Sequence, residues 1–307
     1  MPKNPLNTLP GLLAGLTAAA IWGGMYVVSK VVLEVIPPFA LLTSRLVLGF
    51  LALWLVILWQ GRSSNLPGQI LRHGFSLNKK QFRAAFWVGL VGYGVSLGFQ
   101  FVGTKLSTAA NGSLVTSATP ALVLPFAWLL LKEPITRRRL FAILVASLGV
   151  LAVIDPRKAD WNSDLFLGNL SLLGAALTWA LYSVLVRKVT NEGTNLLQAT
   201  AIFLLGGLPI TIPLGLWEIS TQGLGEITIG IVGGILFLGI ISTAIAMFLW
   251  NYAFAHLPAA AASLTFFAQP VVGSLLGWFF LGEEITTLFI IGGILIGLGI
   301  VISGRDE

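Results

Sequence analysis

Cysteine and histidine are almost missing from this chain. Its 307 residues include no cysteine and two histidines, His73 and His256. Without thiols the chain has no disulfide framework, no thiol nucleophile and no thiolate metal site. Two histidines so far apart in the sequence offer little for a metal centre, so we expect neither a metal nor a cofactor.

Charge is also scarce. Only 10% of the residues are charged and 56% are hydrophobic, whereas about a quarter of the residues in a soluble domain are charged. Such a chain cannot cover its surface with groups that water solvates, so the composition predicts an integral membrane protein. The N-terminal MPKNPLNTLP precedes an apolar run too long for a signal peptide, and we expect it to be retained.

Long apolar runs fill most of the sequence. A helix of about 20 apolar residues crosses a bilayer core. Runs of this length predict ten transmembrane helices, at 11–33, 38–60, 82–104, 107–131, 138–155, 166–187, 196–217, 227–251, 258–281 and 286–303. The predicted fold is an all-α polytopic membrane protein. Its connections are short, apart from 61–81, and leave no room for a soluble catalytic domain.

The placement of the basic residues orients the predicted bundle. With a cytoplasmic N-terminus, 13 of the 18 Lys and Arg residues fall on the inner side and three on the outer side. This asymmetry follows the positive-inside rule and predicts that both termini are cytoplasmic. The net charge of +6 then indicates anionic lipid headgroups of the bilayer as neighbours, and no nucleic acid partner.

An internal repeat organises the chain. The segment Ala109–Thr136 returns as Ala259–Thr286, and 11 of the 28 aligned positions are identical. A second match relates Trp22–Lys30 in the first span to Trp179–Arg187 in the sixth. The repeated unit is therefore five helices long, and ten helices make two units.

A repeat of five helices places its second copy upside down in the membrane, because five is odd. The two predicted units cover 1–157 and 164–307, and Glu133 and Glu283 end up at opposite faces. Inverted repeats of this kind are typical of alternating-access transporters, whose site lies near the midplane between the halves.

The order of the motifs resembles a known family. SATP at 117–120 and FAQP at 267–270 precede KEPIT and GEEIT, and Pro38 is followed by Arg45 in the second span. With the doubled unit, the chain resembles the drug/metabolite transporter superfamily, and within it the EamA-type carriers. The resemblance covers nearly the whole chain. It implies export or exchange of small metabolites, often amino acids, through a cavity lined by the first, third, fourth, sixth, eighth and ninth helices.

Two prolines lie near the middle of the fourth and ninth spans. Pro120 and Pro270 have no N–H, so the carbonyls four residues earlier, of Thr116 and Phe266, lose their helical partners. Such breaks are tolerated where they line a cavity or are covered by protein. We therefore place Thr116, Pro120, Gln269 and Pro270 at the substrate path, with a simple kink as the alternative.

Polar side chains share a face of the third span. Tyr93, Ser96 and Gln100 recur at helical spacing. Trp250 belongs to a weaker counterpart in the eighth span, and Asn111 sits one turn inside the outer end of the fourth. We interpret all five as cavity lining, and hydrogen bonds between helices are the alternative.

Aromatic residues mark two more helix faces. Trp22 and Tyr26 share a face in the first span, and Trp179 and Ser183 share one in the sixth. Aromatic residues at membrane boundaries are commonly interfacial anchors. Because these two tryptophans lie well inside their spans, we interpret them as walls of a pocket suited to aromatic or apolar side chains.

Two cations and two carboxylates complete the candidate site. Lys30 and Arg45 lie within spans toward the outer side and are candidates for binding a substrate carboxylate, with snorkelling or a structural bond as alternatives. Glu133 and Glu283 are gate candidates, or residues that fix a tight turn. No acidic residue falls at mid-membrane, which favours a facilitator or an exchanger over a proton relay.

Together these features predict a secondary transporter that exports small polar metabolites, such as amino acids or related compounds, by alternating access. We expect it in a bacterial inner membrane, where a monomer would suffice because one chain contains both repeats. A membrane receptor or assembly subunit is the alternative. An intramembrane enzyme is a weaker one, because no catalytic constellation falls at membrane depth. No Gly-x-x-x-x-Gly-Lys-Ser/Thr motif for ATP occurs.

Overall fold

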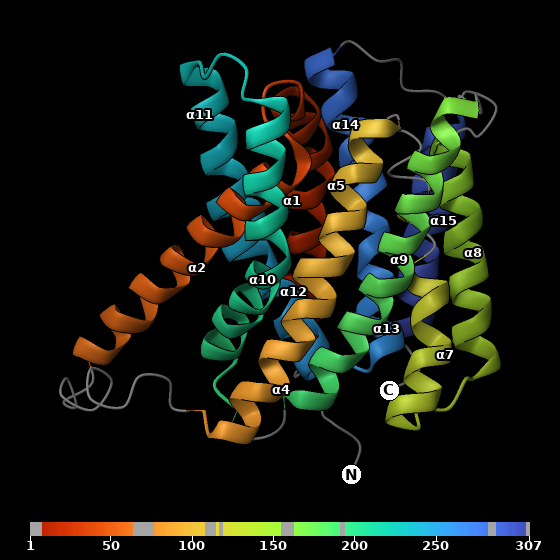
Figure 1. The fold of residues 1–307 in the computed structure, drawn as a ribbon. Helices are drawn as coiled ribbons and strands as arrows, with labels where there is room; N and C mark the ends of the chain where they lie inside the picture. Colours follow the sequence, from red (N-terminus) through yellow and green to blue (C-terminus); the bar gives the residue numbers. More distant parts are fainter. Residues whose placement is uncertain are drawn as a thin grey trace.

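The protein is described by a computed structural model that covers residues 8–63, 77–107, 115–116, 119–154, 163–190, 194–281 and 287–304. These residues form helices and no strand (Figure 1). Six helices are long and apolar enough to cross a membrane. The protein is therefore an all-helical integral membrane protein.

Helices of the first half follow the chain in order. They are α1 (Leu9–Leu33), α2 (Pro38–Ser63), α4 (Lys79–Gly89), the π-helix η2 (Leu90–Ser96), α5 (Leu97–Leu106), α7 (Thr119–Leu131) and α8 (Arg137–Ile154). The segments α4, η2 and α5 form one continuous span. A capping box starts it, because the Asn78 side chain accepts from the Gln81 N–H and the Gln81 side chain accepts from the Asn78 N–H.

The helices of the second half follow in the same way. Its elements are α9 (Ser163–Val189), α10 (Leu196–Gln222), α11 (Ile229–Leu236), the π-helix η4 (Phe237–Ile245), α12 (Ala246–His256), α13 (Ala259–Leu264), the 3-10 turn η5 (Thr265–Phe267), α14 (Ala268–Leu281) and α15 (Thr287–Gly304). Here α11, η4 and α12 form one continuous span with a π segment at its centre. The spans that hold η2 and η4 thus share one irregularity.

Helices of the first half pack against helices of the second half. α2 packs on α10, and α8 packs on α15. α1 packs on α12 and α14, while α9 packs on α5 and α7. In Figure 1, α8 and α15 stand at one edge of the bundle and α2 leans away at the opposite edge.

Small residues let these helices approach closely. A methyl group at Gly149 in α8 would lie 2.7 Å from the carbonyl oxygen of Gly292, and one at Gly299 in α15 would lie 2.7 Å from Cβ of Ala146. Both positions therefore require glycine for this spacing, as is common where transmembrane helices meet.

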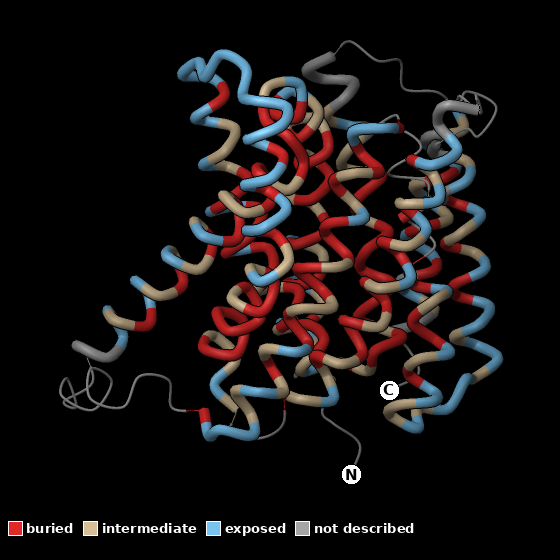
Figure 2. The backbone as a smooth tube through the Cα atoms, in the orientation of Figure 1, coloured by how far each residue is buried: buried red, intermediate tan, exposed pale blue. Residues whose placement is uncertain are grey.

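Burial separates the centre of the bundle from its periphery. Buried residues gather along the middle of the molecule, while the outward faces of the peripheral helices carry exposed residues (Figure 2). Many of the exposed residues are large and apolar, among them Trp59, Trp87, Leu144 and Leu167. An apolar outer surface of this kind suits contact with lipid rather than water.

Candidate functional site

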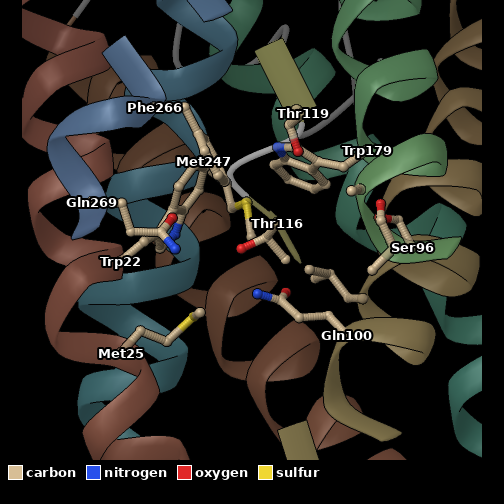
Figure 3. A pocket seen from close by; sticks show the side chains of 13 residues that line it. Trp22, Met25, Ser96, Gln100, Thr116, Thr119, Trp179, Met247, Phe266 and Gln269 are labelled. Atoms are coloured by element: carbon tan, nitrogen blue, oxygen red, sulfur yellow. The ribbon is translucent and has the colours of Figure 1, made fainter. Parts of the chain in front are cut away.

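A cavity lies between helices of both halves, beside the 3-10 turn η5 and the start of α7. Its volume, measured as the space open to the centres of water-sized molecules, is about 30 Å³, which is room for a few waters at most in this conformation. Side chains from α1, η2, α5, α9, α12, η5 and α14 surround it, together with residues around the start of α7 (Figure 3). The polar and aromatic residues that line it are Trp22, Ser96, Gln100, Thr116, Thr119, Trp179, Phe266 and Gln269.

A short polar network holds one wall of the cavity. The side-chain amide of Gln100 donates to the Tyr26 hydroxyl over 3.0 Å, and that hydroxyl lies 3.1 Å from the Thr116 hydroxyl. These groups come from α1, α5 and the short segment before α7. Three residues that the sequence analysis placed on separate helices therefore meet here.

Three cavity-lining residues carry buried polar atoms without a hydrogen-bond partner among the described residues. These atoms are Oγ1 of Thr119, Nε1 of Trp179 and Nε2 of Gln269. A buried polar atom left unpaired costs about 1–3 kcal/mol. The indole and amide nitrogens are donors, and the hydroxyl can donate as well. The cavity wall therefore carries donors that can bind a hydrogen-bond acceptor.

Tryptophan rings form the apolar wall of the cavity. The ring of Trp22 lies 5.6 Å from Trp179 and 5.3 Å from Trp250, measured between centroids. The indole N–H of Trp250 donates to the Ser183 hydroxyl over 3.1 Å. Trp250 and Ser183 thus stand behind the wall and hold it, since neither lines the cavity itself. Such rings favour apolar or aromatic groups.

Tyr93 belongs to a second, fully buried network beside the cavity. Its hydroxyl lies 2.6 Å from the Tyr182 hydroxyl, which donates to the side-chain oxygen of Asn251 over 2.6 Å. The Asn251 amide donates in turn to Thr200 over 3.1 Å. Asn251 is not among the predicted site residues, although a lone amide inside an apolar span is a signal of function or buried pairing.

The two prolines are buried at the beginnings of α7 and α14. Just before Pro270 the helix tightens to the 3-10 turn η5, which contains Phe266. Both Phe266 and Gln269 line the cavity. The irregular backbone before Pro270 therefore lies at the cavity, and part of the corresponding segment before Pro120 lies outside the described residues.

The two cations within spans donate hydrogen bonds to neutral groups. Lys30 donates to the backbone carbonyl of Ser107 near the end of α5. Arg45 is fully buried and donates to the hydroxyls of Thr243 and Ser242 over 3.1 and 3.2 Å. Neither residue lines the cavity.

Glu133 forms an ion pair at one end of the bundle. Its carboxylate lies 3.0 Å from Nε of Arg187 and accepts from the backbone N–H of Ala259. Arg187 also donates to the carbonyls of Phe254 and Leu257. These bonds join the ends of α7, α9, α12 and α13. Two other candidates, Asn111 and Glu283, lie outside the described residues.

The geometry defines a polytopic membrane protein with an internal cavity between helices. The EamA-like transporter family matches residues 9–154 and, a second time, residues 166–305. Because these matches cover most of the chain, the protein belongs to the EamA-like transporter family.

Bacterial relatives agree with this assignment. The chain is 30% identical over 217 residues to "Uncharacterized transporter YyaM" of Bacillus subtilis (strain 168), covering 70% of each chain. It is 24% identical over 292 residues to "Uncharacterized transporter YoaV" of the same organism, covering 95% of this chain and 96% of that one. A solved structure titled "Crystal structure of protein" shares the fold, with a TM-score of 0.75 at 20% identity over 95% of this chain and 96% of that one.

Proposed function

We propose that the protein is a secondary carrier that exports small polar metabolites, such as amino acids or related compounds, through this cavity. The observation that carries the proposal is the combination of unpaired buried donors with tryptophan walls in one space. The donors of Trp179 and Gln269 suit a carboxylate, and the ring of Trp22 suits an apolar side chain. Export rather than import follows from the family resemblance.

The proposed architecture is ten transmembrane helices in two inverted repeats, 1–157 and 164–307. The packing of the helices supports this architecture in addition to the sequence repeat. In this scheme α2 and α10 are mates, as are α8 and α15, and each packs on its own mate. Likewise the contacts of α1 with α12 and α14 mirror those of α9 with α5 and α7. Both continuous spans with a central π segment occupy equivalent places.

The proposed mechanism is alternating access, with Glu133 as part of a gate. The Glu133–Arg187 pair closes the end of the bundle where α1 begins, since Leu257 lies against Gly11 at that end. At the other end Lys30, the repeat mate of Arg187, bonds the carbonyl of Ser107 as Arg187 bonds that of Leu257. Because these two bonds join repeat-related positions, they support a similar gate at each end of the bundle. From the charge asymmetry and the bacterial relatives, we propose a bacterial plasma (inner) membrane with the Glu133 gate facing the cytoplasm.

The test is counterflow into liposomes that contain the purified protein, with a panel of labelled amino acids, nucleosides and sugars. We expect saturable exchange of one class. Gln100→Ala should lower the initial rate about 2- to 10-fold, since it removes a hydrogen bond from the cavity wall. Gln222→Ala, which changes an exposed amide at the end of α10, is the control. If no solute in the panel moves, the receptor or assembly role gains, and an unchanged rate in Gln100→Ala would remove the cavity from the transport path.

A further inference from the structure

Arg45 is a buried cation held only by neutral groups. It lies in the apolar span of α2 with 0% of its surface exposed. Its Nε lies 3.3 Å from the Leu238 carbonyl and 3.1 Å from the Thr243 hydroxyl, and its Cζ lies 4.8 Å from the centre of the Phe101 ring. Nη1 has no hydrogen-bond partner among the described residues.

No described acidic side chain pairs with this cation. The Glu133–Arg187 ion pair lies elsewhere, at the end of the bundle. Arginine keeps its charge in proteins, and an ionised group inside a membrane protein is costly unless a counter-charge or a function accounts for it. The positive charge of Arg45 is therefore balanced by no carboxylate in the described residues.

Only one layer of side chains separates Arg45 from the cavity. Its Nη2 lies 3.6 Å from Sδ of Met25, and Met25 lines the cavity. Met25 is followed in α1 by Tyr26, whose hydroxyl accepts from Gln100 in the cavity wall. None of the cavity-lining residues is acidic. In a medium of low dielectric constant, the field of this charge reaches a molecule bound in the cavity.

We infer that Arg45 sets the charge selectivity of the cavity, favouring a substrate with a carboxylate and disfavouring one with only a cationic group. The carboxylate would accept from the unpaired donors of Trp179 and Gln269. Arg45 acts as a positioning residue through its field, because it does not line the cavity. The inference rests on the proposed function of the cavity and adds the chemistry that it selects.

The alternative is a structural role, in which the bonds of Arg45 to Leu238 and Thr243 hold α2 against η4. The two roles depend on different properties of Arg45. A structural role depends on its hydrogen bonds, whereas selectivity depends on the net charge near Met25. Variants of Arg45 that keep or remove its charge therefore separate them.

Met25→Glu adds an opposing charge, since its carboxylate would stand beside Nη2 of Arg45 and would itself line the cavity. Met25→Gln is the matched neutral control. Arg45→Lys and Arg45→Gln form a second pair that retains or removes the charge. The probes are 3-phenyllactate, an anion, and phenylalaninamide, a cation with the same ring. Binding to the purified full chain in detergent is measured by titration of its unfolding temperature.

We expect the wild-type protein to bind phenyllactate on the order of tenfold more tightly than phenylalaninamide. Met25→Gln and Arg45→Lys should keep this order of preference. Met25→Glu and Arg45→Gln should lose or reverse it. Because binding is measured apart from counterflow, a failure of transport with an intact charge preference would contradict the carrier and leave this inference standing.

Three results would overturn the inference. One is equal binding of the two probes, or of neither, to the wild-type protein. Another is the same anion preference in Met25→Glu as in Met25→Gln. The last is an equal loss of binding of both probes in Arg45→Lys and Arg45→Gln with an unchanged preference between them. That result would identify the role of Arg45 as structural.

Discussion

At the scale of the residue, position decides what a glycine does. A methyl group at Gly89 in α4 would lie 2.0 Å from the backbone carbonyl oxygen of Phe203 in α10. One at Gly233 in α11 would meet nothing within 4 Å. The first glycine is a point of contact between two backbones, and the second is open to its surroundings.

Gly89→Ala should therefore destabilise the protein by about 1–3 kcal/mol, since α4 and α10 must separate. Gly233→Ala is the matched control and should be neutral or stabilising by up to about 1 kcal/mol, because alanine is the better helix former. The unfolding temperature in detergent, with the yield of monodisperse protein, measures both. Equal stability of the two variants would contradict the close approach of α4 and α10.

Sequence reasoning at this scale can group residues by helix face but cannot pair them across helices. Tyr26 and Gln100 were recognised as polar or aromatic members of separate faces, yet their contact joins residues 74 positions apart. The sequence predicts Arg45 within its span as a candidate for binding a substrate carboxylate, and its full burial depends on the neighbouring helices, above all η4. Packing of this kind is set by the tertiary structure, which no local pattern contains.

At the scale of the element, length and apolar character were enough to locate helices. The predicted spans 11–33 and 38–60 correspond to α1 (Leu9–Leu33) and α2 (Pro38–Ser63). The π segments η2 and η4 were not predicted, since a π-helix adds one residue to the hydrogen-bonded ring without a distinctive composition. Prolines did give a local signal, and one of them leads to a prediction.

Pro270→Ala should restore a backbone N–H at the beginning of α14 and allow a regular helix in place of the 3-10 turn η5. The cavity wall formed by Phe266 and Gln269 would then shift. We expect a larger loss in counterflow rate than in expression. Pro213→Ala, an exposed proline within α10, is the control.

The contrary outcome for Pro270→Ala is a wild-type turnover rate with a correctly folded protein. The irregular backbone at η5 would then be a kink without a part in transport. The same measurement on Pro120→Ala tests the repeat-related position.

At the scale of the whole molecule, the Glu133–Arg187 pair connects elements distant in sequence at one end of the bundle. Its side chains are 15% and 24% exposed, so solvent screens the pair in part. Such an arrangement stabilises one conformation modestly and can be released. The stabilisation that this ion pair gives to the closed conformation can therefore be measured by removing one of its charges.

Glu133→Gln should weaken this closure and open the cavity toward the end where α1 begins. Because the sequence contains no cysteine, Ser96→Cys would be the only thiol and would report access to the cavity. We expect labelling by a membrane-impermeant maleimide from that side to rise about two- to fivefold.

The control for this test is Glu226→Gln, which neutralises an exposed carboxylate between α10 and α11. Labelling from the other side should not rise in Glu133→Gln. A rise from both sides would indicate general loosening of the bundle, and no rise from either side would contradict a gate.

The packing of a helix on its own repeat-related helix, as proposed for α2 with α10 and for α8 with α15, has a geometric consequence. If two halves are related by a two-fold axis, a helix can pack against its own mate only where that axis passes between them. On the proposed repeat, the contacts of α2 with α10 and of α8 with α15 therefore mark two points on a single line through the bundle. That line would act as a fulcrum, so that one rocking motion narrows the mouth at one membrane face as it widens the mouth at the other.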